Sequence, residues 1–170
     1  GFQVATKNAT TGAVTTRMSS GMPDLTGLSV SDVATATSIT LAADTISVIN
    51  YTGAAAATCT LPAATQGTVV VYCQAVDTTG GTNTLVFDAA GSDVWATGSV
   101  IESRGSSEAT FDVSTAGETK LTFTPANAAT NLLTIGGQIA FICYEKGTWH
   151  IASSLARETT QTTGAFAFAS

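Results

Sequence analysis

One histidine and three cysteines are the side chains best suited to catalysis or metal binding in this 170-residue chain. His150 lies in the run "GTWHIASS", between the core-type residues Trp149 and Ile151, and no acid or cysteine stands beside it. A general base or a metal ligand needs such partners within reach. We therefore expect His150 to be an outward-facing structural residue. We predict no catalytic residue, no metal site and no cofactor.

The cysteines Cys59, Cys73 and Cys143 show neither the CxxC spacing nor the Cys/His spacing of a zinc site. Each sits in an apolar strand-like run such as "VVVYCQAV" or "IAFICYE". Free cysteine is among the most buried residue types. We expect buried, reduced thiols, which suits a chain that folds in a reducing cytoplasm.

Three acids, Asp77, Asp88 and Asp93, cluster around expected turns. Their oxygens could bind calcium, but the D-x-D-x-D-G spacing of a calcium loop is absent. A polysaccharide hydrolase or lyase would need paired carboxylates at a fixed separation, and alanine at these positions would then abolish activity. Turn-forming aspartate is far commoner than either alternative, and we expect no enzyme.

Aromatic residues make up only 7% of the chain, which leaves little material for a glycan-binding platform. Trp95, Trp149 and Tyr144 could form one, although Trp149 lies in a run with the pattern of a core strand. The Gly pairs in "TGGTN" and "IGGQI" are not phosphate loops, because no lysine follows them. We interpret both as hairpin turns.

The net charge of −6 and the sequence pI of about 4.4 argue against a nucleic-acid partner. Phosphate binding requires clustered Lys and Arg, whereas the six basic residues here are scattered. No stretch approaches the ~20 continuous apolar residues of a membrane-spanning helix. We expect a soluble protein that binds neither nucleic acid nor membrane.

From about residue 39 onward, short strand-like runs alternate with turn segments rich in Gly, Pro, Asn, Asp and Ser. This spacing predicts an all-β protein with two packed antiparallel sheets. In "TKLTFTP", alternation directs Leu121 and Phe123 inward. In "GTVVVYCQAV", both faces are apolar: Val69, Val71 and Cys73 share one face, and the other holds Val70, Tyr72 and Val76.

A sandwich needs only one apolar face per sheet, so a neighbouring subunit or a tail of this chain should cover the second. We expect a homotrimer that uses the surface around Val70, Tyr72 and Ile142.

The two ends of the chain differ from the middle. Residues 1–38 lack sustained apolar periodicity and predict an extended arm, residues 39–155 the sandwich domain, and residues 156–170 a tail. Both ends should lie on another surface. The N-terminal anchors that we expect at that contact are Phe2, Val4, Met18, Met22 and Leu25, and the C-terminal ones are Phe166 and Phe168.

The runs "SITLAADTISVINYTGAAAATCTLPAATQGTVVVYCQAV", "GTNTLVFDAAGSDVW" and "KGTWHIASS", in this order, resemble a pattern of tailed-bacteriophage virion proteins. The resemblance covers roughly residues 39–153 and is to capsid decoration (cement) proteins and tail-fibre modules. It implies a jelly-roll-like sandwich, often trimeric, with a structural role. We therefore expect a decoration protein that binds the major capsid protein on the outer capsid surface after synthesis in the host cytoplasm. The alternative is a receptor-binding or connecting module of a tail fibre.

Overall fold

The computed structural model consists of β-strands, with no helix among the residues it describes, which confirms the all-β prediction. Those residues are 3–7, 14–18, 29–33, 37–78, 83–104, 109–125, 133–157 and 166–170. The strands in chain order are β1 (Gln3–Lys7), β2 (Val14–Met18), β3 (Ser29–Val33), β4 (Ser38–Thr40), β5 (Thr45–Ile49), β6 (Ala57–Thr60), β7 (Val69–Gln74), β8 (Leu85–Asp88), β9 (Val94–Trp95), β10 (Val100–Arg104), β11 (Ala109–Val113), β12 (Lys120–Phe123), β13 (Gln138–Glu145), β14 (Thr148–Arg157) and β15 (Phe166–Ala169).

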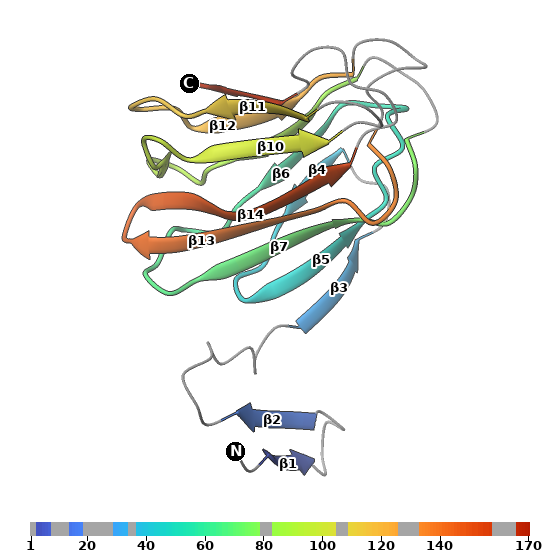
Figure 1. The fold of residues 1–170 in the computed structure, drawn as a ribbon, viewed down its shortest axis with the longest axis vertical. Coiled ribbons are helices and arrows are strands. Elements are labelled where there is room, and N and C mark those ends of the chain that lie inside the picture. The colour runs from blue at the N-terminus through green and yellow to red at the C-terminus, as the bar shows by residue number, and fades with distance from the viewer. Residues whose placement is uncertain are drawn as a thin grey trace.

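Two main sheets share one core in a β-sandwich-like arrangement (Figure 1). The eight-stranded sheet has the order β11-β10-β14-β13-β7-β5-β3, with β9 paired to β14, and the five-stranded sheet has the order β15-β12-β8-β6-β4. Ring contacts join the sheets across the interior. The ring centroids of Tyr72 and Phe87 are 4.9 Å apart, and those of Phe87 and Phe141 are 5.2 Å apart.

From β3 to β8 the chain alternates between the two sheets. Strands β3, β5 and β7 lie in the larger sheet, strands β4, β6 and β8 lie in the smaller one, and neighbours within each set are parallel. Each return to a sheet adds a strand beside the previous one, so this half of the chain winds as a flattened solenoid (Figure 1).

The prediction of an antiparallel sandwich is therefore confirmed only for the two sheets, because both sheets are mixed. Antiparallel pairs dominate the second half, where β13 pairs with β7 and β14, and β12 pairs with β8 and β15. Strands β9 and β10 nevertheless run parallel to β14. Side-chain alternation has a period of two in either strand direction, so the sequence pattern contained no signal that separates parallel from antiparallel neighbours.

The inner faces of the sheets follow the alternation seen in the sequence. Leu121 and Phe123 of β12 are completely buried, as predicted. In β7, Val70 and Tyr72 face the core, while Val69, Val71 and Cys73 are only half-buried. The two sheets thus bury one apolar face each against the other.

The C-terminal residues 166–170 belong to the domain itself. β15 pairs antiparallel with β12 as the edge strand of the five-stranded sheet. Phe166 and Phe168 are buried, with ring centroids 5.2 Å from Phe123 and 5.7 Å from Trp95, respectively. These anchors therefore contact the core of their own chain instead of a partner surface.

The N-terminal residues form two different structures. β1 and β2 pair antiparallel as a separate two-stranded sheet, which Figure 1 shows apart from the two main sheets. β3, although it lies within the segment expected to be an arm, pairs with β5 as the edge strand of the eight-stranded sheet. The part of residues 1–38 that the structure describes thus contributes one strand to the domain and one hairpin outside it.

Asp44 lies between β4 and β5 and forms hydrogen bonds with Val69 of β7, which belongs to the next turn of the solenoid. Its backbone N–H donates to the Val69 carbonyl oxygen at 2.7 Å, and its Oδ1 accepts from the Val69 N–H at 3.1 Å. The φ of Asp44 is 53°, a left-handed conformation that Asp and Asn tolerate better than other non-glycine residues.

We expect Asp44→Ala to lower the free energy of unfolding by about 1–2 kcal/mol, because it removes one hydrogen bond and leaves alanine in the left-handed region. Asp44→Asn should change little, since the amide oxygen can accept the same bond. The stability of Asp44→Gly should lie between those of the other two variants, because glycine adopts the left-handed conformation without strain but cannot accept the hydrogen bond. Urea unfolding of the three variants measures this order, and equal stability of all three would contradict it.

Candidate functional site

The only histidine of the chain contacts an aromatic side chain. His150 is half-buried, and its ring packs against Tyr144 with centroids 5.0 Å apart. Within the described residues, no group of three or more His, Cys, Asp or Glu side chains is placed to hold a metal ion.

The aspartates near turns bind backbone N–H groups. Asp93 Oδ2 accepts from the Ala64 N–H at 2.6 Å, and Asp77 Oδ1 accepts from the Ile135 N–H at 2.7 Å. Each bond joins segments that are far apart in the sequence. These two carboxylates therefore fasten loops, which matches the interpretation of both as turn residues.

The three thiols are free. Burial raises the pKa of Cys59 to about 12, and it also raises the pKa of Cys73 and of Cys143. The thiolate is the nucleophilic and metal-binding form, so these shifts disfavour reactivity at neutral pH. Cys59 and Cys143 are buried as expected, while Cys73 is half-buried on the outer face of β7.

The indole rings cannot form a glycan platform. Trp95 and Trp149 are 1% and 0% exposed. Both rings belong to the core, so neither can stack on a sugar at the surface. Tyr144 is well exposed, but it contacts His150 and not these tryptophans.

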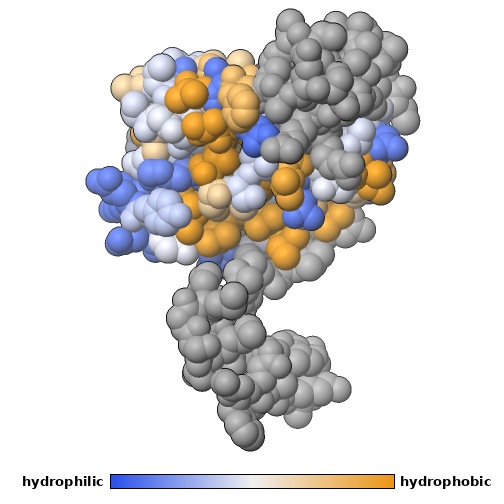
Figure 2. Space-filling model, in the orientation of Figure 1, coloured by the Kyte–Doolittle hydropathy of each residue, from blue (hydrophilic) through white to orange (hydrophobic). Residues whose placement is uncertain are grey.

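The outer face of the eight-stranded sheet is the main candidate for an interaction surface. Its strands β5, β7 and β13 place one apolar side chain beside the next: Ile46 pairs in register with Val71, and Val71 with Ala140. These residues are half-buried, since each is covered on its flanks but not from outside. Figure 2 shows hydrophobic residues gathered on this side of the molecule.

Further apolar side chains lie on this face toward its edge at β11, among polar ones: His150 pairs in register with Ile142, Ser153 with Ala140, and Glu102 with Phe111. Val100 of β10 pairs with Val113 of β11, and both are well exposed. Phe111 and Leu155 are also well exposed, at 64% and 57%. Large exposed apolar surfaces are uncommon on monomers and mark sites of protein association. We call this surface, formed by Ile46, Val48, Val69, Val71, Cys73, Val100, Phe111, Val113, Ala140, Ile142 and Leu155, the outer apolar face.

The interface residues expected from the sequence are placed unevenly. Ile142 lies half-buried on the outer apolar face. Val70 and Tyr72 lie in the core, so the outward residues of β7 are Val69, Val71 and Cys73 instead. Val4 and Met18 lie in β1 and β2, and the predictions for Phe2, Met22 and Leu25 lie outside the described residues.

Sequence reasoning missed Phe111, Val113 and Leu155 as surface residues. Alternation in "ATFDVS" separates Phe111 and Val113 from Asp112 but leaves open which set is buried. In the structure Asp112 faces the second sheet, because its Oδ2 accepts from the Phe168 N–H at 2.7 Å, and Phe111 and Val113 face outward. No signal in β11 alone indicates this; it follows from the position of β15.

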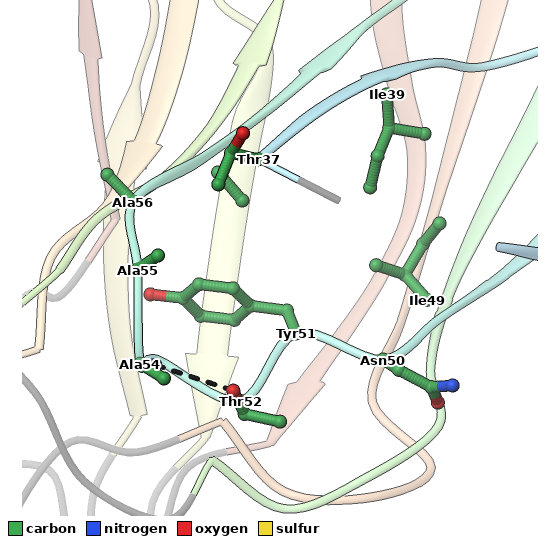
Figure 3. A pocket seen from close by; sticks show the side chains of 10 residues that line it. Thr37, Ile39, Ile49, Asn50, Tyr51, Thr52, Ala54, Ala55 and Ala56 are labelled. Carbon is green, nitrogen blue, oxygen red and sulfur yellow. Dashed lines mark hydrogen bonds between the residues drawn. The ribbon is translucent and has the colours of Figure 1, made fainter. Parts of the chain in front are cut away.

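An apolar cavity of about 120 Å³ lies beside β4 and β5. Ile39, Ile49 and Tyr51 line it together with residues 54–57, four consecutive alanines. Figure 3 shows the Tyr51 ring between the alanines and the two isoleucines. The Tyr51 hydroxyl donates to the Asn83 carbonyl oxygen, and burial raises the pKa of Tyr51 to about 12. The cavity offers apolar contact and no ionised group.

No family model matches the chain, and no curated protein matches it. Among the described residues, no helix is long and apolar enough to cross a membrane.

Proposed function

We propose that this protein is a structural component of a phage virion, a decoration protein that binds the major capsid protein and stabilises the head. The outer apolar face is the observation that carries the proposal, because it provides a broad surface for protein association. The resemblance of residues 39–153 to virion proteins supports the same role. Jelly-roll connectivity remains a prediction for the second half of the chain, where most pairings are antiparallel.

A homotrimer that buries the outer apolar face is the assembly we propose. Burial of a Phe side chain contributes about 1.5–3 kcal/mol, so a trimer that covers Phe111 gains substantially from it. The sparse charge of the chain, with 11% charged residues, lowers the desolvation cost of such an interface.

Phe111→Lys should weaken self-association by about tenfold or more, since a loss of 1.4 kcal/mol corresponds to a factor of ten. The side chain is 64% exposed in the single chain, so the variant should fold normally. Ile135→Lys is the matched control: Ile135 is 58% exposed but lies in the turn before β13. Sedimentation measures the oligomeric state of the wild type and of both variants. A wild-type protein that stays monomeric at micromolar concentration would refute the trimer.

Deletion of residues 1–25 should leave the sandwich folded, with little change in Tm for the isolated protein, while abolishing attachment to capsids. The deleted part includes β1 and β2, which pair with neither main sheet. Attachment is measured by adding the truncated protein to particles that lack the protein and testing whether the two sediment together. Particles that lack the protein should be less heat-tolerant than particles that carry it. Full occupancy by the truncated protein would show that the N-terminal segment is not the anchor. Binding to host-cell glycans and not to capsids would favour the tail-fibre alternative.

A further inference from the structure

The edge strands at the two ends of the sandwich differ in their contacts. At one end, the edge strands β11 and β15 are joined across the sheets by the bond from the Phe168 N–H to Asp112 Oδ2, 2.7 Å long. At the other end, β3 and β4 are the edge strands, and no described strand pairs with the outer edge of either. The cavity lined by Ile39 and Ile49 lies at this same end.

β3 and β4 form the first turn of the solenoid, so the strands of a preceding turn would pair with their outer edges. An unpaired strand edge is a template for another strand, and natural proteins cover or block such edges. Solenoids in particular need a capping element at their ends. The open end therefore calls for an added strand.

A partial sequence repeat gives the register in which a further strand would pair with this edge. β3 and β5 pair with an offset of 16 residues, as in Val30↔Ile46 and Ser31↔Ser47. The pattern Leu-x-x-x-[Ser/Thr]-[Val/Ile]-Ser begins at Leu25 and again at Leu41, with the same offset. One further step of 16 toward the N-terminus places Val14 and Thr15 of β2 opposite Val30 and Ser31. Val14 and Thr15 thus have the side-chain types of the two following turns, whereas Ala9 and Ala13 stand where the pattern has Leu and Ser/Thr, and Arg17 falls opposite Val33.

β2 does not occupy that position in its own chain, where it pairs with β1 and lies apart from β3 (Figure 1). An isolated two-stranded hairpin is at best marginally stable in water, so this hairpin gains from a further strand. Exchange of an identical element between copies is a low-cost route to association.

We propose that the β1–β2 hairpin of one copy seats on the open end of a second copy. β2 runs parallel to the second copy's β3, with Val14 opposite Val30 and Thr15 opposite Ser31. The eight-stranded sheet gains two strands from its neighbour, and main-chain hydrogen bonds along β3 supply the binding energy. This exchange involves copies of the protein alone and can be tested without capsids; loss of capsid attachment on deletion of residues 1–25 would then follow from loss of the exchanged hairpin.

Disulfide trapping between full-length chains tests the register. The half-buried Cys73 is replaced by serine in every variant, while Cys59 and Cys143 are buried and stay. A chain with Thr15→Cys is mixed with a chain carrying Ser31→Cys under mild oxidation, and a covalent mixed dimer is expected. Thr16→Cys mixed with Ser31→Cys is the matched control, since a one-residue shift turns the side chain to the opposite face and should abolish the cross-link.

Amide hydrogen exchange of residues 29–33 distinguishes a second copy from the chain's own hairpin. The amides of β3 that do not donate to β5 report on the exchange: their protection should fall on dilution of the full chain, and deletion of residues 1–18 should remove it. Equal cross-linking in the matched and shifted pairs would overturn the proposal. So would an internal disulfide in a dilute chain that carries both Thr15→Cys and Ser31→Cys, or protection that does not depend on concentration.

Discussion

Removal of residues 166–170 is expected to unfold the domain or to leave it with only a small part of its stability. The truncation takes Phe166 away from Phe123 and Phe168 away from Trp95, and it removes the edge strand paired with β12. Replacing one buried Phe with Ala typically costs about 3–5 kcal/mol. Two such losses approach the whole stability of a typical domain, about 5–15 kcal/mol.

Point variants keep this prediction testable if the truncated protein cannot be purified. Phe168→Ala should lower the free energy of unfolding by about 3–5 kcal/mol in urea titrations. Ala167→Ser is the matched control, because Ala167 lies between the two phenylalanines in β15 and is exposed. Its stability should stay within about 0.5 kcal/mol of wild type. Truncated protein with an unchanged Tm would show that β15 is dispensable for the fold.

We expect deletion of residues 1–25 to leave the domain folded and removal of residues 166–170 to unfold it. This contrast shows what a sequence pattern can and cannot predict. Alternation in "GAFAFAS" correctly indicates that Phe166 and Phe168 share one buried face. It does not say which surface buries them, since a strand of this chain and a partner present the same apolar contact. The answer depends on β12, some forty residues earlier, whose edge is free to pair with β15.

The same limit explains the placement of Val70 and Tyr72. The run "VVVYCQ" has two apolar faces, so its pattern predicts a strand covered on both sides and leaves open which face meets the core. In the structure Tyr72 meets Phe87 of the second sheet, and Val71 points outward. Turn residues were better indicators of where strands begin and end. Gly136 and Gly147 both have a φ of 83°, and they lie in the turns before and after β13.

Gln74 is a buried polar residue that the sequence analysis did not single out. It is 2% exposed at the end of β7. Its Nε2 donates to the carbonyl oxygens of Tyr51 at 2.7 Å and Val76 at 2.6 Å, and its Oε1 accepts from the Tyr72 hydroxyl. Burial is the main cause that raises the pKa of Tyr72 well above its usual value, so this hydroxyl stays protonated and donates. The amide thus satisfies two buried groups and one half-buried group at once.

We expect Gln74→Leu to lower the free energy of unfolding by about 3 kcal/mol or more, because a buried polar group left without a partner costs about 1–3 kcal/mol. For a chain of this length the Tm should fall by about 6–12 °C. Gln138→Leu is the matched control, since Gln138 is exposed on the neighbouring strand β13 and pairs in register with Cys73. Thermal unfolding followed by circular dichroism compares the two variants.

Gln74→Glu separates loss of hydrogen bonds from loss of packing, because it keeps the size of the side chain. At neutral pH the introduced carboxylate faces the Tyr51 and Val76 carbonyl oxygens, which repel it, whereas the protonated carboxyl can donate to one of them. The pKa of the introduced group is therefore raised in the folded state above its unfolded value of about 4.3. Its stabilising contribution is fully present below that pH and is lost as the pH rises through the folded pKa. Relative to wild type, this variant should gain stability on acidification, whereas the deficit of Gln74→Leu should not depend on pH. A pH-independent deficit in Gln74→Glu would mean that water, and not these carbonyl groups, surrounds the side chain.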